Sequence, residues 1–130
     1  MIELLDDVRA LFEGANIAHV ATLLPDGAPH SVPVWVGLEG DRIAFLTGPG
    51  SRKARNLELD PRVSISVTDN ERPFVMAQIR GRVVERMEGD PAWAVIDRLS
   101  DKYIGAPYPV REDRVIFLVE PEHAWGLSYA

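Results

Sequence analysis

A short segment of the chain, residues 47–56, gathers the residue types that bind phosphate groups. It reads Thr-Gly-Pro-Gly-Ser-Arg-Lys-Ala-Arg-Asn. Ser51 is well placed to cap the N-terminus of a helix. Arg52, Lys53 and Arg55 then stand in the first turn, where the helix dipole disfavours positive charge, and such a violated preference points to a compensating ligand. Amide groups, a hydroxyl and three cations at one helix start predict an anion site for a phosphate monoester; a solvated basic turn is the alternative.

Other kinds of catalytic chemistry find little support in the residues. The chain has no cysteine, which excludes thiol catalysis and thiolate metal sites. His19, His30 and His123 show no i, i+4 pairing and no carboxylate at ligand spacing, so no metal site is expected. Tyr103 and Tyr108 could donate a proton to a reduced substrate, although tyrosines beside prolines more often pack a loop. No catalytic side chain is identified by its spacing.

Length, composition and charge limit the class of protein. The 130 residues, 46% of them hydrophobic, predict a single domain over residues 1–130. The net charge of −6 would repel a phosphate backbone, so no nucleic-acid partner is expected. The N-terminal residues include acids where a secretory signal carries positive charge, and no apolar run approaches the roughly 18 residues of a membrane span. We therefore expect a cytoplasmic protein without a membrane partner.

The elements that position these residues follow from the periodicity of the apolar side chains. Helices are expected at residues 2–13, 51–59 and 91–102, the first ended by a left-handed Gly14. Strands are expected at residues 17–24, 30–38, 42–47, 63–68, 74–88 and 114–120. Gly81 interrupts the longest strand and suits a barrel corner. The pattern predicts a mainly β fold with helices (α+β), a six-stranded antiparallel barrel.

The second expected strand has two unlike faces. Val32, Val34 and Val36 alternate with Ser31, Pro33 and Trp35. One face is therefore expected to be buried, while the face that carries the proline and the tryptophan could receive a flat ring.

The sequence resembles the pyridoxamine 5′-phosphate oxidase-like flavoproteins over nearly its whole length. The resemblance is carried by residues 47–53, 60–63, 26–29 and 81–83. Within this superfamily, residues 56–57, 96–109 and 120–126 are similar to the actinobacterial branch that uses coenzyme F420, a deazaflavin with a phosphate-linked tail. The resemblance implies a split β-barrel of the FMN-binding-protein type.

The resemblance also implies where the cofactor lies. It places these residues at the cofactor phosphate or close by: Thr47, Ser51, Arg52, Lys53, Arg55 and Asn56. It places three more beside the tricyclic ring, mostly through their backbone: Val32, Pro33 and Val34. Gln78 would approach the ring or its ribityl chain. Because the family holds its cofactor between two subunits, a homodimer is expected in which Trp125 reaches the partner's site.

The function implied by the resemblance is that of an F420-dependent oxidoreductase, which transfers hydride between the deazaflavin and a small conjugated organic substrate. The alternatives are an FMN-binding oxidoreductase of the same type and a non-catalytic carrier of flavin or deazaflavin, because both cofactors present phosphate on a polyol chain. True pyridoxamine phosphate oxidases have a basic, tryptophan-containing C-terminal segment that this sequence lacks. Vitamin B6 oxidation is therefore not expected.

Overall fold

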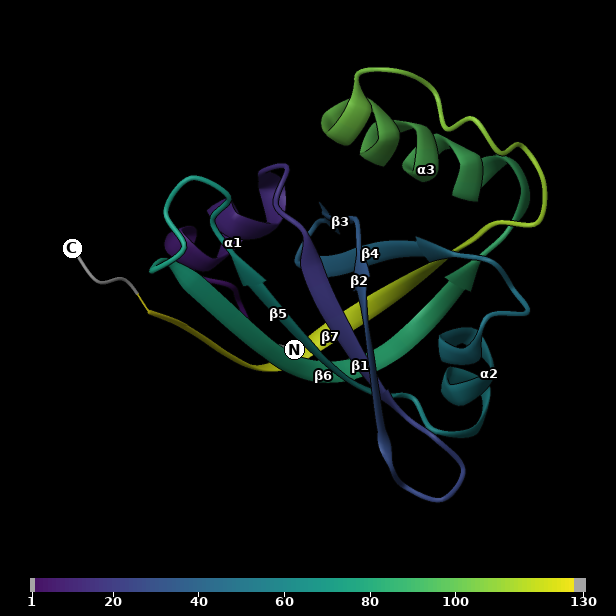
Figure 1. Cartoon of the computed structure of the whole chain (residues 1–130), viewed down its shortest axis with the longest axis horizontal. Helices are drawn as coiled ribbons and strands as arrows, with labels where there is room; N and C mark the ends of the chain where they lie inside the picture. The colour runs from purple at the N-terminus through teal and green to yellow at the C-terminus, as the bar shows by residue number, and fades with distance from the viewer. Residues whose placement is uncertain (1, 128–130) are drawn as a thin grey trace.

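The computed structural model describes residues 2–127, which form seven strands and three helices (Figure 1). The strands are β1 (Ala18–Leu23), β2 (Pro29–Val34), β3 (Val36–Glu39), β4 (Arg42–Thr47), β5 (Arg62–Thr68), β6 (Met76–Met87) and β7 (Val115–Leu127). The helices are α1 (Asp6–Glu13), α2 (Arg52–Leu59) and α3 (Gly89–Ile104). Within residues 2–127, no helix is long and apolar enough to cross a bilayer.

The strands form one curled antiparallel sheet in the order β2-β1-β5-β6-β7-β4-β3. The two edge strands, β2 and β3, are consecutive in the chain and are separated by Trp35 alone. The chain therefore crosses from one edge of the sheet to the other within one residue, and this crossing brings the edges of the barrel together. The predicted α+β split barrel is confirmed, with one strand more than expected.

The barrel is filled by one apolar core and flanked by a second. Alternate residues of the strands point inward, as Val20, Ile65 and Phe45 do, and Phe12 of α1 joins them with its side chain fully buried. On the outside, α3 packs against β4 and β7 through a second cluster that includes Ile96. Figure 1 shows α3 over one side of the sheet, with α1 and α2 toward opposite ends. The outer face of β1 and β5 carries no such cluster among the described residues, and its side chains are exposed or half-buried.

The expected strand over residues 30–38 is wrong in one respect, since it breaks at Trp35 into β2 and β3. The predicted alternation is nevertheless present: Val34 and Val36 are buried and Val32 partly so, while Pro33 is exposed. Because the alternation continues through the break, the sequence pattern does not reveal that β2 pairs with β1 and β3 with β4.

The ends of three other elements also differ from expectation. The first helix begins at Asp6, because Leu5 has an extended backbone, and Gly14 ends it with φ −72° and not in the left-handed region. The third helix extends at both ends of the expected 91–102. The last strand continues from Val115 to Leu127, beyond the expected end at residue 120, because it pairs with β6 along its whole length.

Gly81 fulfils its predicted role at a bend of β6. The pairing of β6 with β7 shifts its register between Arg80 and Gly81. A Cβ at position 81 would lie 2.1 Å from the carbonyl oxygen of Glu120. Only glycine therefore permits the close approach of the two strands at this point.

Candidate functional site

The turn between β4 and α2 fixes two hydroxyl groups at the start of the helix. Thr47, the buried last residue of β4, has its Oγ1 2.9 Å from Ser51 Oγ. Ser51 caps α2 by accepting a hydrogen bond from the backbone N–H of Ala54 at 3.2 Å, so the predicted N-cap is confirmed. The Ser51 N–H donates to the Gly48 carbonyl at 3.1 Å. Both hydroxyls are thus held in place by the fold.

Three cations follow this cap without a counter-ion. Arg52, Lys53 and Arg55 form no ion pair with any residue from 2 to 127, although eight other arginines in that range do. Arg55 is exposed, whereas Arg52 and Lys53 are half-buried. Burial lowers the pKa of the Lys53 ammonium. A half-buried cation at a helix N-terminus, with no neighbouring carboxylate to stabilise it, is suited to an anionic ligand.

Asn56 faces the interior and holds Arg52 in position. It is fully buried, and its Nδ2 donates to Thr22 Oγ1 of β1 at 2.9 Å. Its Oδ1 accepts a hydrogen bond from Arg52 Nε at 3.0 Å. Asn56 therefore ties α2 to β1 and sets the direction of the Arg52 guanidinium.

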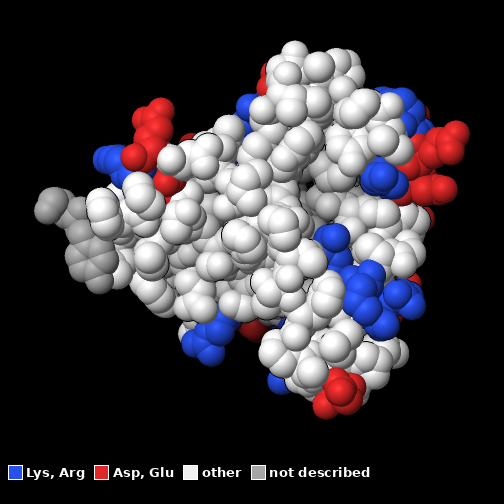
Figure 2. Space-filling view, in the orientation of Figure 1, with Lys and Arg blue, Asp and Glu red and all other residues white. Residues whose placement is uncertain are grey.

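A cavity of about 830 Å³ opens beside the β4–α2 turn. Figure 2 shows it as a hollow between α3 and the sheet, with lysine and arginine side chains near its rim. It is lined by Ile17, Pro33, Val34, Trp35, Leu46, Thr47, Gly48, Lys53, Ile104, Tyr108, Pro109 and Arg114. Most of these side chains are apolar, two are cationic and none is acidic. The cavity can thus receive a flat ring and an anionic group together.

The cavity brings together four of the predicted site residues, Pro33, Val34, Thr47 and Lys53. Ser51 reaches it through its contact with Thr47. Four others stand apart from the lining. Arg52 is bound to Asn56 through its Nε. Val32 packs against the core of the barrel, Arg55 points to solvent and Asn56 is buried.

Gln78 and Trp125 lie on the outer face of the sheet. Trp125 Nε1 donates to Gln78 Oε1 at 2.8 Å, and the two residues are partners in the pairing of β6 with β7. Successive partners connect them across the sheet, from Gln78 to Ser66, then to His19 and to Pro33. This row of outward-facing residues runs from Trp125 to the edge of the cavity.

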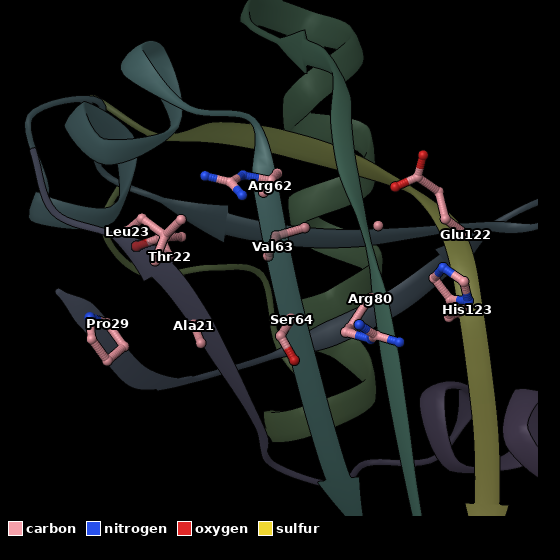
Figure 3. A pocket seen from close by; sticks show the side chains of 11 residues that line it. Ala21, Thr22, Leu23, Pro29, Arg62, Val63, Ser64, Arg80, Glu122 and His123 are labelled. Atoms are coloured by element: carbon pink, nitrogen blue, oxygen red, sulfur yellow. The ribbon is translucent and has the colours of Figure 1, made fainter. Parts of the chain in front are cut away.

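A second cavity, of about 460 Å³, lies on the same outer face. Figure 3 shows Ser64, Arg80 and His123 on three neighbouring strands, with Arg62 and Glu122 nearby. None of the predicted site residues lines it. Four of the eleven predicted cofactor residues therefore line the larger cavity, and none lines this one.

The last turn of α3 forms a structural clamp beside the larger cavity. Tyr103 Oη donates to the Asn16 carbonyl at 2.6 Å and accepts from the Val36 N–H at 3.1 Å. Its ring stacks on Trp35, with centroids 5.0 Å apart. Lys102 donates to the carbonyls of Phe12 and Val36. Since the Tyr103 hydroxyl is engaged by the backbone and burial raises its pKa, Tyr103 is poorly placed to donate a proton to a substrate.

Sequence reasoning missed several residues of the cavity, among them Arg114, Ile104 and Leu46. Arg114 lies before β7, and its Nη1 would be 3.6 Å from a Cβ at Gly48. It becomes the second cation of the site only because β7 pairs with β4. No local signal around Arg114 could have shown this.

Fold and site together define a split-barrel protein with a basic turn at the start of α2 beside an apolar cavity. Residues 4–128 match the family model described as pyridoxamine 5′-phosphate oxidase, and the chain belongs to this family. The resemblance found in the sequence is thereby confirmed.

Comparison with solved structures also finds similar proteins. An F420 reductase is similar at 30% identity, with 94% of this chain and 98% of that chain covered and a TM-score of 0.81. The hypothetical protein Rv2991 from Mycobacterium tuberculosis is 22% identical (98% and 86% covered, TM-score 0.77). A heme binding protein from Mycobacterium smegmatis is 23% identical (99% and 57% covered, TM-score 0.73). The last two show the fold alone, and none of the curated proteins matches.

Proposed function

We propose that this chain is an F420-dependent oxidoreductase, which transfers hydride between the deazaflavin and a small conjugated organic substrate. One observation carries the proposal: Lys53 is half-buried beside an apolar cavity and has no anionic partner within residues 2–127. A phosphate at this place would pair with Lys53 and accept hydrogen bonds from the first amides of α2 and from whichever of the Thr47 and Ser51 hydroxyls does not donate to the other.

The residues of the cavity fit such a cofactor in size and in chemistry. Its volume of about 830 Å³ lies within the usual range of ligand sites, about 300–1,000 Å³. The phosphate end is polar, and Pro33, Val34 and Trp35 offer an apolar edge to a tricyclic ring. When bound, the deazaflavin supplies the hydride chemistry, and the chain binds and orients the reactants and limits the access of water.

Two observations favour F420 over the other cofactors. The F420 reductase that resembles this chain covers nearly all of it at 30% identity. The described residues that line the cavity include no histidine, cysteine or methionine, so of the usual axial ligands of haem iron only a tyrosine, Tyr108, is present. FMN remains the alternative, because the turn offers the same contacts to its phosphate.

Parallel fluorescence titrations with F420 and FMN test the choice of cofactor. We expect F420 to bind more tightly. Tighter binding of FMN, or flavin retained through purification, would overturn the choice of F420 and leave the family assignment intact.

Turnover is tested with reduced F420 and a series of enones and quinones, followed by the return of the absorbance of oxidised F420. We expect at least one acceptor to reoxidise the cofactor, and Lys53→Ala to slow this at cofactor concentrations that just saturate the wild type. Binding of F420 without turnover on any acceptor would instead make the chain a carrier.

The outer face of the sheet supports a homodimer as part of the same proposal. Figure 2 shows few charged atoms in the middle of the face formed by β1, β2 and β5. Trp125, at the end of the row described above, is 50% exposed. A second copy covering this face would bury that row and bring Trp125 close to the partner's cavity. Sedimentation at micromolar concentration should give twice the chain mass, and a monomer at all concentrations would contradict the shared site.

A further inference from the structure

The two tyrosines near Trp35 differ in what their hydroxyl groups can do. The Tyr103 hydroxyl is engaged by the backbone on both sides of its oxygen. Tyr108 lines the cavity, and its ring meets Trp35 edge-on, with centroids 5.9 Å apart and planes at 88°. Its hydroxyl accepts a hydrogen bond from Arg114 Nε at 3.4 Å, and no group within residues 2–127 accepts its proton. The Tyr108 hydroxyl is therefore free to donate.

Tyr108 is held in place before any ligand binds. Its N–H donates to Asp97 Oδ1 at 3.1 Å, and its carbonyl accepts from Arg111 Nη1 at 3.2 Å. Arg111 also pairs with Asp97 at 2.6 Å. The hydrogen bonds from Arg111 and then from the Tyr108 N–H lower the pKa of the Asp97 carboxyl, so this anchor stays ionised. Ser100 fixes the start of the same loop by donating to the Ala106 carbonyl at 2.6 Å.

Arg114 is the positive group beside the Tyr108 hydroxyl. Its Nη1 donates to the carbonyls of Asp113 at 2.8 Å and Glu112 at 3.3 Å, which orients the guanidinium. Asp113 has φ 51°, so the chain turns sharply just before Arg114. Lys53 is the other cation of the cavity and stands at the α2 end. A cavity with two cations and no acid stabilises negative charge that develops on a bound molecule.

We propose that Tyr108 and Arg114 form an oxyanion site for the substrate, with Tyr108 as the proton donor. The proposal rests on the proposed hydride-transfer function and names its substrate class: flat conjugated ketones and quinones. An electron-poor carbon of the substrate accepts hydride, its C=C π bond breaks, and the electron pair moves to the carbonyl oxygen. That oxygen takes the proton of the Tyr108 hydroxyl. Arg114 stabilises the resulting phenolate, which regains a proton from water.

Binding of 4-nitrophenolate, a flat coloured oxyanion, tests the site without turnover. Its absorbance is followed during titration with wild-type protein, Tyr108→Phe and the matched control Tyr103→Phe. Loss of one charged hydrogen bond should raise the dissociation constant of Tyr108→Phe by about 10- to 150-fold. The dissociation constant of Tyr103→Phe should stay within about twofold of the wild-type value, while the melting temperature of this variant falls. Equal affinity of the wild type and Tyr108→Phe would overturn the proposal.

Two further experiments show where 4-nitrophenolate binds and test the oxyanion site separately from the proposed hydride transfer. Lys53→Ala should weaken 4-nitrophenolate binding less than Tyr108→Phe does; the reverse order would place the probe at α2 and overturn the site. With F420 and a substrate, Tyr108→Phe should lower kcat by about 10²-fold or more at unchanged F420 affinity. Unchanged kcat would overturn the proton donor and leave hydride transfer standing. If 4-nitrophenolate binding depends on Tyr108 but no acceptor is turned over, the oxyanion site is supported and the proposed hydride transfer is not.

Discussion

Two lysines of this chain are buried to a similar extent but differ in their hydrogen-bond partners. Lys53 in α2 and Lys102 in α3 are both half-buried, and burial lowers the pKa of both, that of Lys102 to about 8. Lys102 donates to the carbonyls of Phe12 and Val36, which joins α3 to α1 and to the crossing between β2 and β3. Lys53 has no such partner among the described residues. Burial alone therefore does not point to a ligand site, and the proposed site depends on Lys53 being half-buried and also without a partner among the described residues.

The largest effect is expected from Lys53→Ala. Removing one charged hydrogen bond should raise the dissociation constant of F420 by about 10- to 150-fold. The apo variant should melt at or slightly above the wild type, because a cation in the first helical turn costs about 0.3–1 kcal/mol. Fluorescence titration and thermal unfolding measure the two effects. Unchanged affinity with a loss of several kcal/mol of stability would make Lys53 a structural charge like Lys102.

Lys102→Met should show the opposite behaviour. It leaves the carbonyls of Phe12 and Val36 without their donor, which should lower the free energy of unfolding by about 1–3 kcal/mol. F420 affinity should stay within about threefold of the wild type. Denaturant unfolding and the same fluorescence titration check both. If Lys102→Met is fully stable but loses cofactor as Lys53→Ala does, the contrast between the two lysines disappears.

Arg52→Ala should combine both effects. It removes a cation from the proposed anion site and also the hydrogen bond to Asn56, which is fully buried. We expect weaker F420 binding together with a loss of about 0.5–1.5 kcal/mol of stability in the apo protein. From the sequence alone, stability would be expected to stay level or rise, as for Lys53→Ala. A stabilised apo Arg52→Ala would show that the Arg52–Asn56 bond contributes nothing.

The smallest effect is a pH dependence that belongs to Lys102. In the folded chain its pKa is about 8, whereas in the unfolded chain Lys102 keeps its proton up to its ordinary value of 10.5. Between these pH values the unfolded state binds more protons, so the free energy of unfolding of the wild type rises with pH relative to Lys102→Met. Unfolding curves of the wild type and Lys102→Met at pH 7 and pH 9.5 should show that the difference between their free energies of unfolding increases with pH. If this difference is the same at both pH values, the pKa of Lys102 is not lowered in the folded protein.

The sequence predicts the local structure of the β4–α2 turn well because its parts are contiguous. The Ser51 cap and the cations behind it need only a helix start, which local chemistry determines. The barrel is also predictable, since each strand shows its own alternation. The contacts of Asn56 are not, because its partner Thr22 lies 34 residues away. The sequence marks Tyr108 as a possible proton donor, but its place in the cavity beside Arg114 becomes visible only in the tertiary structure, where β7 pairs with β4.

The break between β2 and β3 could not be predicted from the sequence for a different reason. Alternating valines continue from Val32 to Val36, and nothing local to Trp35 shows that the chain changes edge there. The crossing is fixed by Lys102 and Tyr103, which bond Val36 from a helix more than sixty residues further along the chain. Such a contact depends on the tertiary structure and leaves no periodic signal in the sequence.

The most direct test of the account is an NMR titration of the lysine side chains in the free and F420-bound protein. We predict that the pKa of Lys53 is below 10.5 in the free protein and rises when the cofactor phosphate binds, because a nearby negative charge favours the protonated form. Lys102 serves as the control in the same spectra, with a pKa near 8 in both states. A Lys53 pKa that F420 binding leaves unchanged would contradict the assignment of this turn as the cofactor's phosphate site.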